Sequence, residues 1–472
     1  MKKLKNVANK IVPHDLCIGC GVCAGICPAN AIEMRFNKLG QYVPVTTAKG
    51  CIDKCGLCLC VCPFGKNEVN EDVLAKKAFS HMTGIRYRVE TGYVLDCYLG
   101  YSNRPHQRIK GASGGLATWF LQRLIEENIV DKVVSVVSNS GEPQKLFKFA
   151  VLDTPEAIQQ SSRSCYYPVE LSDVIREILT TEGRYAVTGL PCFLKALRLA
   201  MTRNRKLRHR IVVLVGLVCG HTKSKFFVEY LTALQGSDPS ALVAVKFREK
   251  HKDRMANDHG IKLIVQEKEQ EKEEVVFWTD GINRAWTHEY FKPNPCYLCD
   301  DVFAETADVV FMDAWLPQCK LDYRGHSIVI NRQEQFKSIW ETALAAPHAT
   351  MQRLDVDQAI RSQRGSLSTK RQGLQFRLFL ARNSKMEFPS KRVAPTMAGN
   401  LIQRRLWQLK QKVSRLSCSV WRKDKDLFKF QQALKKIDQK IRFWETLQRF
   451  HLMVHEGRLW SALQKRCKRF LK

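Results

Sequence analysis

Short apolar runs alternate with helical patterns over residues 81–345. Four runs rich in β-branched and aromatic residues are expected to be strands: residues 133–137, 184–188, 210–218 and 242–248. Apolar side chains recur at helical spacing over residues 116–125, and further helices are expected around residues 173–180 and after Cys192. Residues 261–279 have the pattern of a hairpin. The alternation of strands and helices predicts an α/β domain.

The pattern changes on both sides of this region. Residues 1–80 are rich in Cys, and residues 31–35 and 41–45 are expected to form a hairpin around a Gly-containing turn. Residues 346–472 have basic side chains interleaved with apolar ones, at a spacing that predicts amphipathic helices near the C-terminal end. We therefore expect three parts: 1–80, 81–345 and 346–472.

Positive charge is concentrated in the last part. The chain of 472 residues has a formal net charge of +30, and residues 401–472 hold 20 Lys and Arg against 5 Asp and Glu. Such a block favours an anionic partner. Three interpretations are open: helices packed on the α/β domain, interfacial helices on an anionic membrane surface, or a docking surface for an acidic redox partner protein such as ferredoxin. Nucleic acid is not an expected partner.

The sequence contains no candidate for a membrane-spanning helix. Its longest apolar run, residues 211–219, is far shorter than the roughly 20 residues that a spanning helix needs. The first residues are basic but no apolar signal core follows them. The 18 Cys residues are not spread like a disulfide framework. We expect a reducing, cytoplasmic location, with peripheral attachment to the inner membrane face as the alternative if the tail binds lipid.

The first Cys group has the spacing of a bacterial ferredoxin. It has the form C-x2-C-x2-C-x3-C-P, with thiols at Cys17, Cys20, Cys23 and Cys27. Two-residue gaps let one tight turn place three sulfurs around a [4Fe–4S] cluster, and the fourth Cys ligates the other cluster in two-cluster ferredoxins. A structural zinc site is the alternative, but zinc sites usually use separated Cys pairs. The run therefore predicts electron transfer.

A second Cys group has the form C-x3-C-x2-C-x3-C-P, one residue longer than the standard form at its first gap. Its members are Cys51, Cys55, Cys58 and Cys62, and Cys60 lies outside this frame. The crossover rule predicts two ligand sets: Cys17, Cys20, Cys23 and Cys62 for one cluster, and Cys51, Cys55, Cys58 and Cys27 for the other. The alternative for the second cluster is an altered or degraded site, or one that uses Cys60.

Four later Cys residues lie at the ends of expected strands or in a C-x2-C turn: Cys192, Cys219, Cys296 and Cys299. Because ligands collect at the carboxyl ends of strands in α/β sheets, these thiols are candidates for a third [4Fe–4S] cluster. The alternative is that they are small buried hydrophobic residues. The remaining Cys residues are expected to be structural: Cys97, Cys165, Cys319, Cys418 and Cys467.

A basic, Gly-rich turn at residues 108–115 precedes the helix expected at residues 116–125. Ser113 is a candidate cap for that helix, and Gly114 and Gly115 let backbone N–H groups approach a ligand. The unpaired donors and positive dipole at a helix N-terminus favour phosphate. The alternative is an ordinary capped helix after a turn. The sequence has no Rossmann G-x-G-x-x-G and no Walker lysine motif.

The order of these motifs resembles that of one family over residues 10–345. This family is the beta subunit of coenzyme F420-reducing hydrogenase, with related F420-linked dehydrogenase subunits. After the two Cys groups, its motifs correspond here to residues 110–115, 162–163, 189–192, 219–221, 246–250, 296–299 and 307–315. No single motif is specific, but the ordered set is.

The resemblance implies a fold and a set of cofactors. The fold would be an α+β ferredoxin-like N-terminal domain, an α/β flavin-binding domain and a helical basic C-terminal extension. FAD would bind near these residues: Lys110, Ser113, Gly114, Gly115, Thr118 and Arg163. Electrons would pass between two [4Fe–4S] clusters and FAD, with a third cluster if the later Cys residues bind iron, and on to coenzyme F420 or another acceptor. A flavin suits this task because it exchanges single electrons with clusters and hydride with substrates.

Two other functions fit the same motifs. One is a ferredoxin-dependent reductase of an organic substrate, and the other is a non-catalytic electron-transfer subunit of a larger complex. A redox partner, either ferredoxin or other oxidoreductase subunits, is expected in each case. No residue is assigned as catalytic. His221 and Asp313 are the candidates for proton transfer, although a His near a sheet edge is more often structural.

Overall fold

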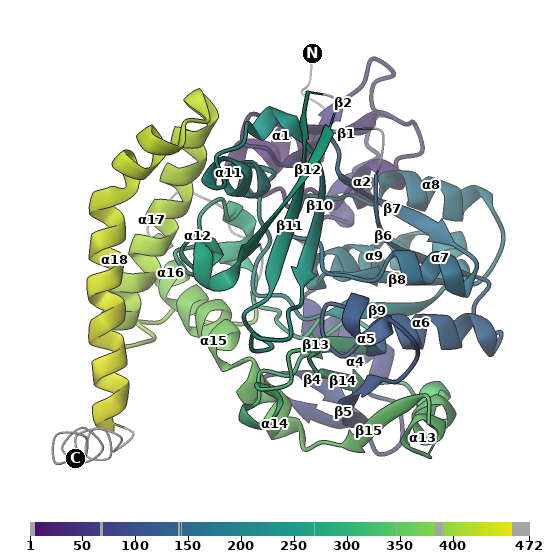
Figure 1. Ribbon diagram of the computed structural model, residues 1–472. Helices are drawn as coiled ribbons and strands as arrows, with labels where there is room; N and C mark the ends of the chain where they lie inside the picture. The colour runs from purple at the N-terminus through teal and green to yellow at the C-terminus, as the bar shows by residue number, and fades with distance from the viewer. Residues whose placement is uncertain are drawn as a thin grey trace, which may run out of the picture.

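The computed structural model describes residues 5–66, 69–139, 142, 144–268, 270–345, 347–382, 389 and 391–455 (Figure 1). Cys467 and the last residues of the basic tail lie outside the described residues. Within the described ranges, no helix combines the length and the apolarity needed to cross a membrane.

A mixed sheet of eight strands forms the centre of the molecule (Figure 1). Its order is β15-β5-β14-β13-β9-β8-β6-β7, in which β13, β9, β8 and β6 are parallel to one another and the other neighbours pair antiparallel. The strands are β5 (Asp96–Ser102), β6 (Lys132–Ser138), β7 (Phe147–Leu152), β8 (Tyr185–Gly189), β9 (Ile211–Leu217), β13 (Val309–Asp313), β14 (Ser327–Asn331) and β15 (Ala349–Arg353). The mixed α/β architecture and the strands expected at 133–137, 184–188 and 210–218 are therefore confirmed. β15 lies beyond residue 345, the expected end of the second part.

Helices cover both faces of this sheet. One face packs on α6 (Leu116–Glu126) and α13 (Lys337–Ala345), where Trp119, Phe120 and Trp340 are buried. The other face packs on α8 (Ser172–Thr180) and α9 (Pro191–Arg203). Two shorter helices complete this region: α7 (Pro155–Gln160) and α10 (Arg205–Arg210). The helices expected around 116–125 and 173–180 and after Cys192 are confirmed as α6, α8 and α9.

The Cys-rich N-terminal module packs against α8 and α9. Its elements are α1 (Val7–Lys10), η1 (Val12–His14), α2 (Val22–Gly25), β1 (Ile32–Phe36), β2 (Tyr42–Thr46), α3 (Leu57–Cys60), α4 (Glu71–Phe79), β3 (Arg86–Arg88) and β4 (Gly92–Val94). The expected hairpin is confirmed, because β1 pairs antiparallel with β2 from Ile32–Thr46 to Phe36–Tyr42. The Cys20 carbonyl accepts a hydrogen bond from the Leu171 N–H at 3.0 Å, which joins the module to the start of α8.

A second, three-stranded sheet stands beside the first. It contains β10 (Leu242–Glu249), β11 (Gly260–Glu267) and β12 (Gln270–Phe277), so the hairpin expected at 261–279 is confirmed. The strand expected at 242–248 belongs here rather than to the central sheet, because β11 follows it directly and consecutive strands commonly pair. The remaining elements of this part of the chain are α5 (Gln107–Lys110), α11 (Phe226–Leu234), η2 (Pro239–Ala241), η3 (Trp278–Asp280), α12 (Ile282–Thr287), η4 (Asn294–Leu298), η5 (Pro317–Cys319) and η6 (Glu334–Phe336).

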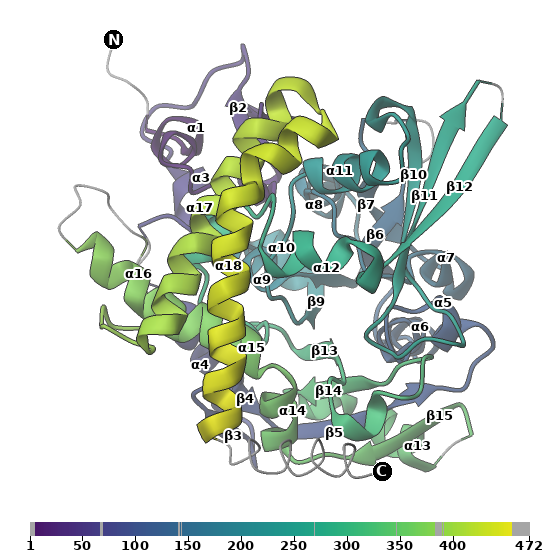
Figure 2. The same cartoon turned by 60° about the vertical axis from the view of Figure 1, so that its left-hand side comes forward.

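The described C-terminal part is mainly helical, and its last described residues form two long helices (Figure 2). Its elements are α14 (Val356–Ser362), α15 (Arg364–Leu367), a π-helical turn η7 (Ser368–Gln372), α16 (Gly373–Ala381), α17 (Leu401–Asp424) and α18 (Leu427–His455). Trp421 of α17 and Phe430 of α18 are buried in one cluster with Phe291. Packing on the domain is therefore confirmed for α17 and the first half of α18, whereas Phe443 and Phe450 are 60% and 55% exposed.

Candidate iron–sulfur and cofactor site

The first expected ligand set converges on one small cavity. All four thiols line it: Cys17, Cys20, Cys23 and Cys62. The loop before α2 packs closely on β2, because a Cβ on Gly19 would stand 2.7 Å from the Tyr42 carbonyl oxygen. The Gly19 N–H also donates to Cys17 Sγ at 3.4 Å. The loop and α2 thus hold three of the thiols, and the turn after α3 brings the fourth.

The second expected set lines a separate cavity of about 390 Å³. Its four thiols are Cys27, Cys51, Cys55 and Cys58. Among the described residues, Cys60 does not line this cavity. The Asn6 side-chain amide donates to Cys51 Sγ at 3.3 Å, and the Ala31 N–H donates to Cys27 Sγ at 3.4 Å. This arrangement agrees with the frame that leaves Cys60 out, and ligation itself stays a prediction.

Burial makes several of these thiols weak acids. It raises the pKa of Cys20 to about 12 and that of Cys62 to about 11. A bound metal deprotonates its thiol ligands, so iron would offset this cost. In the described part of the chain, no three His, Cys, Asp or Glu side chains are grouped closely enough to hold a single metal ion.

The structure also brings the later four Cys residues together from three segments. Cys192 lies in the first turn of α9, Cys219 follows β9, and Cys296 and Cys299 lie in and after η4. Burial raises the pKa of Cys192 well above its ordinary value, and the charges of Cys299, Cys219 and Cys296 raise it further. Cys20 of the first set also raises it. The first and third sets are therefore electrostatic neighbours.

A cavity of about 820 Å³ opens beside the third set. Pockets for small molecules and cofactors commonly have about 300–1,000 Å³, so the size suits a cofactor. Four of the expected FAD-site residues line it: Ser113, Gly115, Thr118 and Arg163. Cys219 lines the same cavity. Lys110 is exposed and Gly114 is packed behind the turn, and neither is among the lining residues.

The Gly-rich turn is held by hydrogen bonds to the start of β14, and no described side chain caps the helix that follows it. Gly115 has a φ of 81° and is the residue before α6, and Ser113 does not cap this helix as we expected. The Ser113 hydroxyl instead donates to the His326 carbonyl, because the turn lies against the start of β14. The Gly114 N–H donates to Ser327 Oγ at 3.0 Å. The N-terminus of α6 is thereby fixed at the cavity wall.

Two cations at the end of β10, Arg248 within it and Lys250 directly after it, fasten the same turn, and sequence reasoning gave them no role. Arg248 Nε donates to the Ala112 carbonyl at 3.0 Å, and Lys250 Nζ donates to the carbonyls of Arg108 and Ser113, each at 2.6 Å. Their motif was visible in the sequence, but no local pattern shows which carbonyls a distant Lys will reach. Arg163 lines the cavity and is ion-paired with Glu249.

The two candidates for proton transfer both line the cavity. The buried His221 Nε2 has no hydrogen-bond partner among the described residues, and its ring centroid lies 4.7 Å from that of Trp286. Burial and nearby Lys residues hold the pKa of His221 well below its ordinary value. Asp313 is ion-paired with Arg248 at 2.5 Å. Of the two candidates, His221 therefore keeps a ring nitrogen without a partner among the described residues, and the Asp313 carboxylate is already engaged.

Comparison with known proteins gives the family. The model for the N-terminal part of the coenzyme F420 hydrogenase/dehydrogenase beta subunit matches residues 97–176, and the model for its C-terminal part matches residues 182–357. The chain belongs to this family. A 4Fe-4S binding domain also matches residues 11–33, which contain the first Cys group and support a [4Fe–4S] cluster.

Two curated relatives are distant and longer than the matched region. One subunit of F420H2 dehydrogenase from Methanosarcina mazei is 22% identical over 218 residues, which cover 44% of this chain and 55% of the relative. Coenzyme F420-dependent sulfite reductase from Methanocaldococcus jannaschii is 24% identical over 335 residues, 70% of this chain and 46% of the relative. The chain thus spans about half the length of these relatives.

One solved structure also matches the chain. It is a xenon derivative of the F420-reducing [NiFe] hydrogenase complex from Methanosarcina barkeri, with 18% identity and a TM-score of 0.44. The match covers 60% of this chain and 92% of the chain in that structure.

Proposed function

We propose that this chain is an iron–sulfur flavoprotein oxidoreductase. It passes electrons between [4Fe–4S] clusters and FAD, and on to coenzyme F420 or another hydride acceptor. The observation that carries the proposal is the series formed by the three Cys sets and the large cavity. The charge of Cys20 in the first set raises the pKa of Cys192 in the third set, so these two sets are close to each other. Cys219 of the third set lines the cavity.

The second Cys set extends the series outward. Cys58 raises the pKa of both Cys23 and Cys62, so the second set is the neighbour of the first. Cys55 is exposed, whereas Cys296 and Cys299 are buried. Electrons would therefore enter or leave at the second set and reach the cavity through the first and third sets.

The residues around the cavity fit a dinucleotide flavin. The N-terminus of α6 offers backbone donors for a pyrophosphate, and Arg163, paired with Glu249, lines the same cavity. Bound FAD would supply the conversion between single-electron and hydride transfer. The chain itself would orient the cofactor through the Gly-rich turn that Arg248 and Lys250 hold.

Family membership and the names of the two relatives support an F420-linked reaction. The chain matches only about half of each relative, and one is named as a subunit of a dehydrogenase, so we propose that the chain works with redox partner proteins. The location we propose is the cytoplasm, with peripheral attachment to the inner membrane face through the tail as the alternative.

Anaerobic purification with an iron assay and a visible spectrum tests the proposal. About twelve irons and one flavin per chain are expected for three clusters and FAD, and about eight irons would remove the third cluster alone. Absence of flavin after anaerobic reconstitution would contradict the flavoprotein proposal and favour an electron-transfer subunit without a substrate of its own.

A further inference from the structure

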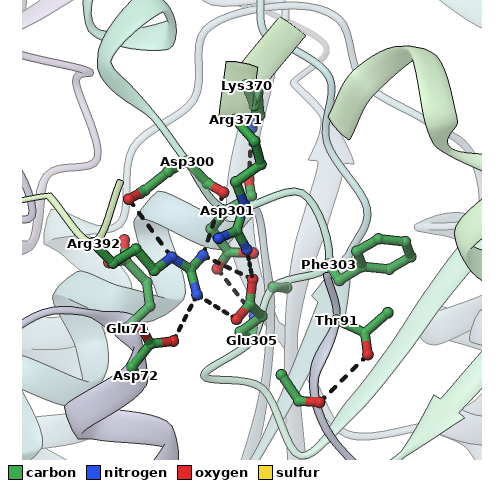
Figure 3. Close-up of polar contacts among 12 residues, drawn as sticks. Glu71, Asp72, Thr91, Asp300, Asp301, Phe303, Glu305, Lys370, Arg371 and Arg392 are labelled. Atoms are coloured by element: carbon green, nitrogen blue, oxygen red, sulfur yellow. Dashed lines mark hydrogen bonds and ion pairs between the residues drawn. The ribbon is translucent and has the colours of Figure 1, made fainter. Parts of the chain in front are cut away.

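A buried network of charges surrounds the segment that follows Cys299 (Figure 3). The carboxylates come from α4 and from this segment: Glu71, Asp72, Asp300, Asp301 and Glu305. The cations from the C-terminal part are Lys370, Arg371, Lys391 and Arg392. Asp300 and Glu305 have fully buried side chains. Buried carboxylates at this density are tolerated only with paired charges.

The C-terminal part supplies that pairing. Arg392 forms ion pairs with Glu305 and with Asp72, the latter at 2.8 Å, and Arg371 reaches Glu305 at 2.8 Å. Arg371, Lys391 and Arg392 lie beyond residue 357, where the match to the family ends, whereas Glu71 pairs with Lys195 inside that match. Asp300 and Glu305, which follow Cys299, are thus paired by cations from a part of the chain outside the family match.

Within this network, Lys370 makes the contact that points to a redox role. Its Nζ donates to Cys299 Sγ at 3.3 Å and to the Asp301 carbonyl oxygen at 2.7 Å. The residue is only 3% exposed, and it lies in the π-helical turn η7, a distortion that is frequent at functional sites. A buried ammonium group therefore stands against one thiol of the third set.

We propose that Lys370 is a positioning residue that raises the reduction potential of the cluster held by the third Cys set. The inference rests on the proposed function, which supplies the cluster. An added electron makes a thiolate-bound cluster more negative, and both a hydrogen bond to a ligand sulfur and a nearby positive charge stabilise that reduced state. The cluster nearest the cavity is then a better electron acceptor than the Cys ligands alone would make it.

Redox titration of the full-length, reconstituted protein, followed by electron paramagnetic resonance, tests this role. Lys370→Met removes the charge and the donor at similar length, and Lys370→Arg keeps both. We expect the midpoint potential of one cluster to fall in Lys370→Met, and to stay close to that of the wild type in Lys370→Arg. Lys337→Met on α13 is the matched control, because that side chain is 60% exposed and lies on another helix.

The iron content separates the possible failures. About eight irons in the wild type would contradict the third cluster and therefore this inference. That result would leave the proposals of FAD and of the first two clusters unaffected. About twelve irons with unchanged potentials in Lys370→Met would overturn the inference alone. If Lys370→Met loses iron, Lys370→Gln takes its place, and a lower potential is again expected. Iron loss in both variants would mean that Lys370 only holds the segment, and would also overturn the inference.

Discussion

Gly114 shows how little space the Gly-rich turn leaves. A Cβ at this position would lie 2.7 Å from the Gly100 carbonyl oxygen and 2.7 Å from the Ser327 nitrogen. Both are backbone atoms of the central sheet, so Gly114→Ala must displace the turn that opens α6. We expect a loss of about 1–3 kcal/mol in the free energy of unfolding, as for other overpacked sites, and weaker flavin binding.

Thermal unfolding and flavin fluorescence measure the two effects. The matched control is Gly365→Ala in α15, where an added Cβ meets nothing within 4 Å. Since Ala is the better helix former, the control should keep or raise stability. Equal behaviour of the two variants would show that the turn does not constrain the site.

Cys51 and Cys60 allow a second test at the scale of single residues. Cys51 lines the second cavity and Cys60 does not, although the two were alternatives in the sequence. Cys51→Ser should lower the iron content of the reconstituted protein by up to about four atoms, whereas Cys60→Ser should leave it unchanged. Comparable iron loss in both variants would contradict the ligand frame.

The roles of residues were predictable where the residues that act together are close in the sequence. The Cys spacing of the first two sets is local because a single turn must place several sulfurs, and the two cavities group these thiols as the crossover rule expects. Lys370 was not predictable. It meets Cys299 across 71 residues of chain, and nothing in its own neighbourhood in the sequence marks it.

Among the elements, α18 is anchored by a buried His–carboxylate contact. His288 Nδ1 lies 2.7 Å from Asp438 Oδ1, and the Tyr290 hydroxyl donates to the same carboxylate. Glu445 lies 3.7 Å from His288 Nε2, and Lys410 pairs with Glu445 at 2.9 Å. Burial lowers the pKa of His288, but the hydrogen bonds to Asp438 and Glu445 outweigh it, so the pKa is raised.

A pH dependence follows from that shift. A raised folded-state pKa adds stability that is fully present below the unfolded value, about 6.5, and is lost as the pH rises through the folded value. Asp438→Asn should therefore destabilise the protein more at about pH 6 than at about pH 9. Denaturant unfolding at both pH values measures the difference. A penalty that does not change with pH would exclude His288 as the titrating group.

The sequence predicted which segments form helices or strands better than it predicted which strands pair with one another. Three of the four parallel strands, β6, β8 and β9, and the helices α6, α8 and α9 followed from apolar runs and helical spacing, whereas β13 was not predicted as a strand. The place of β10 in a second sheet was not predicted either, because its pattern fits either sheet and the choice depends on β11. The tail helices were expected, but their packing on Phe291 and Tyr230 depends on the aromatic cluster that the whole fold assembles.

At the scale of the whole molecule, the basic helical hairpin of α17 and α18 stands beside the N-terminal module (Figure 2). Arg415 of α17 donates to Asn294 Oδ1 at 3.2 Å, and the Asn294 side-chain amide donates to the Asp15 carbonyl at 3.1 Å. The contact reaches Asp15, two residues before Cys17 of the first set, so α17 brings positive charge close to the Cys-rich module. This arrangement favours an acidic electron-transfer protein as the partner.

Charge reversal on α18 should therefore slow electron transfer from an acidic donor such as reduced ferredoxin. Lys436 and Lys440 are exposed on this helix, and Lys436→Glu with Lys440→Glu should lower the second-order rate at low salt. The difference should shrink as added salt screens the charges. The matched control reverses the charges of Lys206 and Arg208. Both side chains are exposed on α10, a helix that packs on α8 and α9. Equal slowing in the two double variants would mean that only the net charge of the protein affects the rate. An unchanged rate in the α18 variant, together with lost binding to anionic vesicles, would instead assign the hairpin to a membrane surface.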